Sequence, residues 1–143
     1  MKIVVDADAC PVKKEIIHIA KKHGIDVVMV CDTSHVLSDE YARIVVVDKG
    51  SDSADFALIN LVDKGDIVVT QDYGVAAMAL AKGARAISNS GIIFTKFNID
   101  AYLAQRHLAK ENRRKGGKFP KTKKQTKEDL GASFVQALNS LIG

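Results

Sequence analysis

Short runs of β-branched and apolar residues, separated by stretches with helical spacing, set the strongest limit on the fold of this chain. The runs are Ile3–Val5, Val27–Val30, Ile44–Val47, Ile67–Val69 and a weaker Ala86–Ser88, with Ile92–Phe94 as a sixth candidate. They are continuous rather than alternating, which is typical of strands buried on both faces of a parallel sheet. Helical patterns lie between them, at about 11–23, 53–64 and 74–83. Strands that alternate with helices predict a wound α/β sheet with right-handed crossovers.

After residue 97 the pattern becomes more polar. Residues 98–115 predict a long helix with a basic end, and residues 118–127 predict a Lys-rich loop. A capping-box pattern at Thr126–Asp129 opens a last helix at about 127–142. With 143 residues and 47% hydrophobic composition, one core can form without a disulfide or a structural metal. No apolar run approaches the ~20 residues of a membrane span, and the start is not a secretory signal. We therefore expect residues 1–143 to be a single cytoplasmic domain.

Aspartates follow the ends of the predicted strands. They are Asp6 and Asp8 after the first strand, Asp32 after the second, Asp48, Asp52 and Asp55 after the third, and Asp72 after the fourth. In open parallel sheets, ligand sites form at the carboxyl ends of the strands. Clustered carboxylates repel each other unless a cation lies among them, and their oxygens suit Mg²⁺ or Mn²⁺. We predict a metal site built from Asp6, Asp8, Asp52, Asp55 and Asp72, in which two ions ~4 Å apart would activate a water against a phosphodiester.

A purely structural interpretation competes with the metal site at each position. Aspartate is common after strands because it begins turns and caps helices. Asp72 would cap the helix that follows it, and Asp52 would cap a helix beginning near Ser53, with Asp55 in the first turn. For Asp32 and Asp48 the structural interpretation is preferred.

Four motifs resemble the YaiI/YqxD family of uncharacterised bacterial proteins. They are V-D-A-D-A-C-P-V-K at Val5–Lys13, G-S-D-S-A-D at Gly50–Asp55, V-T-Q-D-Y-G at Val69–Gly74, and the stretch from Lys82 to Arg106 with F-N-I-D-A-Y-L-A-Q-R. The resemblance implies a PIN-like three-layer sandwich with a mostly parallel central sheet and a metal-dependent nuclease-type site. It implies that Asp6, Asp55 and Asp72 are the catalytic acids, with Asp8 and Asp52 as further candidates.

The positive charge is concentrated in one segment. Residues 106–127 hold ten Lys and Arg against one Glu, whereas residues 1–105 carry a net charge of −3. The predicted contacts to nucleic acid are Arg106, Lys110, Arg113, Arg114, Lys115, Lys118, Lys121, Lys123 and Lys124. Such a basic arm can neutralise phosphates, although a solvated helix and tail remains the alternative. Lys13 and Lys14, on the exposed side of the first predicted helix, could also contact a phosphate.

These features together favour a Mg²⁺- or Mn²⁺-dependent nuclease-like protein that hydrolyses RNA or another phosphodiester, with water as the nucleophile. A non-catalytic RNA- or ribosome-binding protein is the alternative from another class. A haloacid-dehalogenase-like phosphatase is a weaker one, in which Asp6 would be the nucleophile and Asp8 the acid. Cys10 and Cys31 form no CxxC pair, so a zinc site is not favoured and a small buried thiol is preferred for Cys10. A homodimer is a further expectation.

Overall fold

Six strands in the described residues form one sheet, in the spatial order β3-β2-β1-β4-β5-β6. The computed structural model describes residues 1–33, 38–48, 51–105 and 127–143, without the side chains of residues 9, 51–54 and 127–130. The strands are β1 (Lys2–Asp6), β2 (Asp26–Asp32), β3 (Arg43–Val47), β4 (Ile67–Val69), β5 (Arg85–Ile87) and β6 (Ile93–Phe94). Neighbouring strands are parallel except for β5 and β6. All six predicted strands are therefore present.

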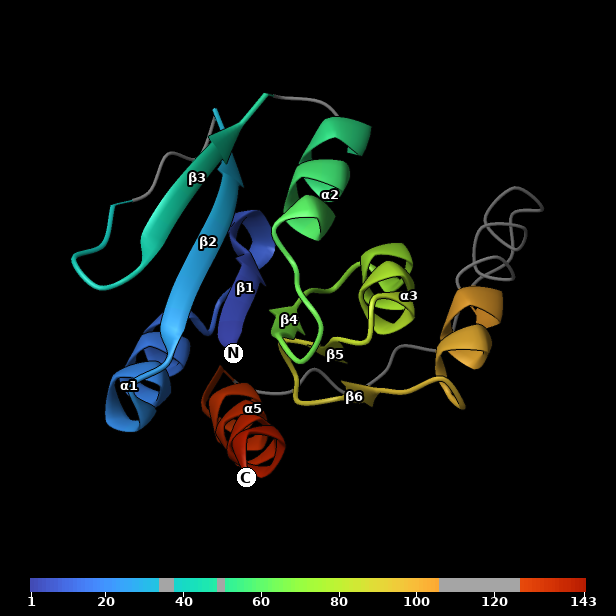
Figure 1. The fold of residues 1–143 in the computed structure, drawn as a ribbon. Coiled ribbons are helices and arrows are strands. Elements are labelled where there is room, and N and C mark those ends of the chain that lie inside the picture. Colours follow the sequence, from blue (N-terminus) through green and yellow to red (C-terminus); the bar gives the residue numbers. More distant parts are fainter. Residues whose placement is uncertain (34–37, 49–50, 106–126) are drawn as a thin grey trace.

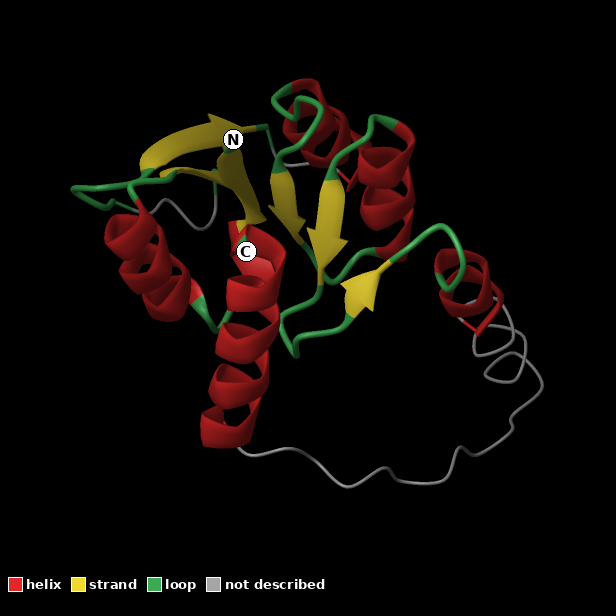
Figure 2. Cartoon of the chain, turned by 60° about the horizontal axis from the view of Figure 1, so that its bottom comes forward, coloured by secondary structure: helices red, strands yellow, loops and turns green. Residues whose placement is uncertain are grey.

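Helices cover both faces of this sheet. They are α1 (Lys13–His23), α2 (Ser51–Asn60), α3 (Tyr73–Ala81) and α5 (Lys127–Ile142), with a short 3-10 helix η1 (Ala7–Ala9) and a helical segment at 99–105. Helices α1 and α5 lie on one face, and α2 and α3 lie on the other (Figures 1 and 2). The predicted α/β three-layer sandwich is confirmed. In the part of the chain that the structure describes, no helix is long and apolar enough to cross a membrane.

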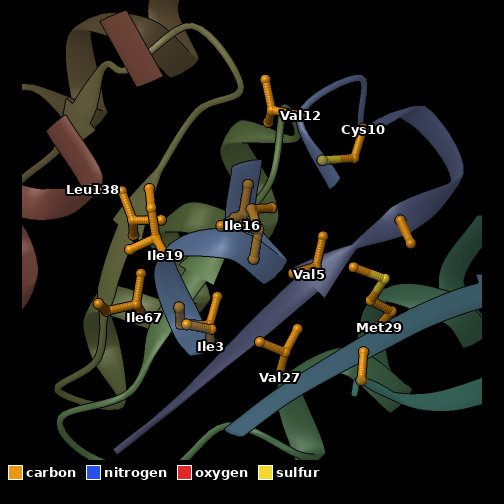
Figure 3. Close-up of a cluster of buried hydrophobic side chains, with 14 of the residues drawn as sticks. Ile3, Val5, Cys10, Val12, Ile16, Ile19, Val27, Met29, Ile67 and Leu138 are labelled. Atoms are coloured by element: carbon orange, nitrogen blue, oxygen red, sulfur yellow. The ribbon is translucent and has the colours of Figure 1, made fainter. Parts of the chain in front are cut away.

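The strands contribute alternate residues to two separate cores. Ile3 and Val5 of β1 face α1 and α5, where Ile16, Ile19 and Leu138 pack against them (Figure 3). Val4 faces the opposite layer and belongs to the core beneath α2 and α3. Each strand is thus apolar on both faces, which explains why the sequence shows continuous runs rather than alternation.

Helices α1 and α2 differ from their predicted bounds for local reasons. The helix predicted from residue 11 begins at Lys13, because Pro11 and Val12 form a turn after η1. The helix predicted to reach residue 64 ends at Asn60. There, Leu61 and Val62 donate their amide hydrogens to carbonyls three residues back, which tightens the last turn and stops the helix.

Helix α5 is held close to the turn that precedes β6. Gly91 has φ of +90°, and a Cβ at this position would lie 2.6 Å from the carbonyl oxygen of Ser133. Only glycine allows both this conformation and this approach. The contact fixes α5 against the sheet, with Phe134 fully buried beneath it.

The amino ends of the central strands carry a paired charge. The Lys2 ammonium donates to the buried Asp66 carboxylate at 2.6 Å and to the exposed Asp63 carboxylate at 2.8 Å. Burial alone would raise the pKa of Asp66, but hydrogen bonds from Lys2 and from the Asp63 amide lower it below the usual value. At this edge of the sheet the buried acid is therefore neutralised within the fold.

Candidate active site at the carboxyl ends of β1 and β4

The strand order reverses at one defined place in the sheet. The chain runs outward from β1 through β2 to β3 and then returns to pair β4 with the other side of β1. The crossovers leave the carboxyl ends of β1 and β4 in opposite directions, which makes this the topological switch point of the sheet. Asp6 ends β1, and Thr70 directly follows β4. Ligands of open α/β sheets bind at this place, so these residues define the candidate site.

Asp6 is the half-buried carboxylate at the centre of the site. Its Oδ2 accepts a hydrogen bond from the Thr70 hydroxyl at 3.2 Å, and the Thr70 Oγ1 accepts one from the Asp72 amide at 3.0 Å. Because the Asp72 amide fills an acceptor position on Thr70, the hydroxyl proton is directed to Asp6. Burial raises the pKa of Asp6, the Thr70 hydrogen bond opposes this, and the negative charges of Asp8 and Asp72 raise the pKa further. Three predicted acids therefore act on one another here.

Thr70 was missed in the sequence analysis, although it lies inside one of the motifs quoted there. The side chain is completely buried, and its backbone amide donates to the carbonyl of Ile87. A buried hydroxyl needs a polar partner, and Asp6 provides it. The available signal was a threonine directly after an apolar strand and two residues before an aspartate.

The side chain of Asp8 links η1 to the end of β2 by hydrogen bonding. Both of its carboxylate oxygens accept the backbone amide of Asp32, at 3.1 and 3.2 Å. Asp8 therefore has a structural task in addition to its charge near Asp6. Asp32 contributes its backbone to this contact, in keeping with the structural interpretation preferred for it.

Asp72 caps α3. Its Oδ1 accepts the amides of Gly74 at 2.8 Å and Val75 at 3.2 Å. The structural interpretation of this residue is therefore correct, and it coexists with a position beside Asp6.

The cap leads to a stability prediction for Asp72. Asp72→Ala should lower the free energy of unfolding by about 1 kcal/mol, because two amides of α3 lose their acceptor. Asp72→Asn should change it by only a few tenths of a kcal/mol, since asparagine caps helices equally well. Urea denaturation at pH 7 measures both. Equal losses in the two variants would show that charge, rather than the cap, is the stabilising feature.

Asp52 and Asp55 lie on α2, which begins four residues after β3 ends and so starts near the same edge of the sheet. Asp55 is half-buried, and Asp52 falls in the first turn of α2 rather than at the predicted cap position. The side chain of Asp52 lies outside the described residues. Among the described side chains, the charges that act on Asp6 are those of Asp8 and Asp72. Asp48 is exposed after β3.

The donor set at this edge suits a hard cation, because it consists of carboxylate and hydroxyl oxygens. The pKa of Asp6 is raised by burial first and then by the charges of Asp8 and Asp72, and a bound cation would oppose both effects. Against this, Asp8 and Asp72 already bind backbone amides, and a metal would have to share them. Within the described residues, no three His, Cys, Asp or Glu side chains are grouped closely enough to hold a metal ion. The metal site therefore stays a prediction.

The sequence analysis also considered two cysteines and nine basic residues. Cys10 and Cys31 are free and buried, and burial raises the pKa of the Cys10 thiol despite a backbone hydrogen bond at Val12. A thiol with this pKa is mostly protonated near neutral pH, which suits the preferred interpretation of Cys10 as a small buried side chain. The nine basic residues predicted to bind nucleic acid, from Arg106 to Lys124, lie outside the described residues.

Fold and site together define an α/β protein of three layers whose acidic side chains meet at the switch point of its sheet. The chain belongs to the family described as uncharacterized BCR, YaiI/YqxD family, whose model matches residues 4–143. The resemblance seen in the sequence motifs is thereby confirmed.

Curated relatives match nearly the whole chain. A UPF0178 protein of Ruminiclostridium cellulolyticum is 54% identical over 96% of this chain and 90% of its own. Another, from Alkaliphilus oremlandii, is 59% identical over 90% of this chain and 83% of its own. A third, from Lachnoclostridium phytofermentans, is 53% identical over 99% of this chain and 97% of its own. No solved structure gives a significant match. The names of these relatives identify a protein family and state no activity.

Proposed function

We propose that this protein is a cytoplasmic, Mg²⁺- or Mn²⁺-dependent hydrolase of phosphodiesters with RNA as its substrate class, built on a PIN-like domain. The observation that carries the proposal is the carboxylate of Asp6, half-buried at the switch point and facing the charges of Asp8 and Asp72. The contrast with the other edge of the sheet supports it, because the buried Asp66 there is neutralised by Lys2. Like charges held close together cost stability, and such a cost is typical of functional sites.

In this proposal each residue has a distinct task. Asp6, Asp8, Asp52, Asp55 and Asp72 would hold the metal, which would supply an activated water and stabilise the leaving oxygen. The Thr70 hydroxyl orients the Asp6 carboxylate by donating a hydrogen bond to it, and this bond opposes the rise in the pKa of Asp6 that burial causes. Asp72 fixes the start of α3 at the site through its cap, and Asp8 fixes the end of β2.

A cleavage assay tests this function. End-labelled single-stranded and structured RNA would be incubated with the protein in Mn²⁺, Mg²⁺ or EDTA. Asp72→Asn is the test variant because asparagine preserves the cap. Asp26→Asn is the matched control, since Asp26 is exposed at the amino end of β2. We expect metal-dependent cleavage by the wild type and the control, with a loss of at least about 100-fold in Asp72→Asn. Equal cleavage by Asp72→Asn would contradict the proposal.

The second candidate is a non-catalytic RNA-binding protein. The observation in its favour is that Asp8 and Asp72 already serve as backbone acceptors, a role that requires no metal. This function predicts RNA binding that survives both EDTA and an Asp6→Asn, Asp72→Asn double variant. Retention of intact RNA without cleavage under every metal condition would favour it over the hydrolase.

A further inference from the structure

A groove of about 320 Å³ runs along the side of α1 that faces the chain before β3. It is lined by Lys13, Lys14, Ile17, His18, Lys21, Met29, Ser38 and Asp39. The α1 residues among these form one stripe, separate from the buried stripe of Ile16, Ile19 and Ala20. Among the described residues that line this groove there is no acid of the switch point.

The charge of the groove is positive. Three lysines line it against one acid, Asp39, so its net charge is +2 with the histidine neutral. Asp39 is already engaged, because its Oδ1 accepts the amides of Tyr41 and Ala42, both at 2.8 Å. Glu15 is turned toward α5, with its Oε1 3.6 Å from the position of a Cβ on Gly131. Within the part of the chain that the structure describes, no other acid lines the groove, so the three lysines can attract an external anion.

The floor of the groove is apolar. Met29 of β2 and Ile17 of α1 line it, and at its far end the Lys21 ammonium lies 5.6 Å from the centre of the Tyr41 ring. A ligand that combines negative charge with a flat or apolar body would match both the lysines and the apolar floor of the groove. The stripe from Lys13 to Lys21 spans about 12 Å, which exceeds the size of one phosphate group.

The end of the groove at Lys13 lies close to the candidate active site. The charges of Lys13 and of Asp6 both act on the Cys10 thiol, so both groups lie near it. Lys13 also begins α1, four residues after η1 ends and five after Asp8. A chain lying in the groove would therefore lead toward the carboxylates.

We propose that this groove binds a single-stranded nucleic acid, with its phosphates on Lys13, Lys14 and Lys21 and a base or ribose against Ile17 and Met29. The proposal deepens the proposed function, on which it rests for the class of ligand. It adds a contact surface within the described residues, independent of the basic segment. Each lysine–phosphate contact releases condensed counterions, so binding weakens as salt is raised.

Methyl NMR tests the groove in the wild-type protein. With methyl-labelled methionine, Met29 reports on the groove floor, whereas Met78 of α3 lies on the opposite face of the sheet and serves as the internal control. In EDTA, a single-stranded RNA oligonucleotide should shift the Met29 signal and leave the Met78 signal in place. An unchanged Met29 signal at saturating RNA would overturn the proposal. An equal Met29 shift with tripolyphosphate or with oligoglutamate would overturn the assignment to nucleic acid.

A charge variant provides the second measurement. Lys14→Gln, Lys21→Gln removes two exposed lysines of the groove, and Lys22→Gln removes an exposed lysine of α1 that does not line it. Fluorescence anisotropy in EDTA should show about 10-fold weaker RNA binding for the double variant and a salt slope reduced by about 1.4. Equal affinities for the double variant and Lys22→Gln would contradict the proposal. Because no cleavage is measured here, failure of the groove and failure of the hydrolase are separate results.

Discussion

Asp6→Asn is expected to cleave RNA at least about 100-fold more slowly than the wild type, yet to be no less stable at pH 7. The loss of activity follows from the proposed role of Asp6 as the central ligand at the switch point. The stability follows from the surroundings of the carboxylate, which is half-buried and repelled by Asp8 and Asp72. An asparagine at this position carries no charge to desolvate and can still pair with the Thr70 hydroxyl.

The difference in stability between Asp6→Asn and the wild type should change with pH in a defined direction. The pKa of Asp6 is raised in the folded state, so folding favours the protonated form. The stability that protonation provides is present below the unfolded-state pKa and is lost as pH rises through the folded-state pKa. The advantage of Asp6→Asn should therefore be largest at neutral pH and shrink as pH falls. Urea denaturation of both proteins from pH 7 to pH 4 measures it. If Asp6→Asn were less stable than the wild type at pH 7, this would contradict the view that burial and the charges of Asp8 and Asp72 destabilise the Asp6 carboxylate.

Phe134→Ala should lower the free energy of unfolding by about 3–5 kcal/mol. The ring is completely buried between α5 and the sheet, in the same core as Ile3, Ile16 and Leu138. This loss is a large share of the roughly 5–15 kcal/mol that stabilise a domain of this kind. Urea denaturation followed by circular dichroism measures it, with exposed Gln136→Ala as the control within about 0.5 kcal/mol. A loss below about 1 kcal/mol would mean that α5 does not complete this core.

The layers of the fold could be predicted because burial dictates the sequence pattern. Strands such as β1 and β4 are buried on both faces, so their residues form continuous apolar runs that local composition reveals. The 3-10 helix η1 could not be predicted, because three residues are too few to show a period. The antiparallel pairing of β6 with β5 could not be predicted from the sequence either, because a two-residue strand gives no signal for its direction.

The candidate site was predictable in its position but not in its contacts. The placement of Asp6, Asp8 and Asp72 after strands indicated a shared edge of the sheet, and the effects of Asp8 and Asp72 on Asp6 agree with it. The hydrogen bond from Thr70 to Asp6 depends on the register between β1 and β4, which no local pattern encodes. The groove beside α1 depends likewise on how the chain before β3 approaches that helix.

The two cores on either side of β1 also limit which changes of length the protein can tolerate. Ile3 and Val5 point to one core and Val4 to the other, and by the same alternation Asp6 lies on the side of Val4. Deleting or inserting one residue within this strand would exchange the two faces and turn the carboxylate away from Thr70. The spacing between Lys2 and Asp6 is therefore as strict a requirement as the aspartate itself.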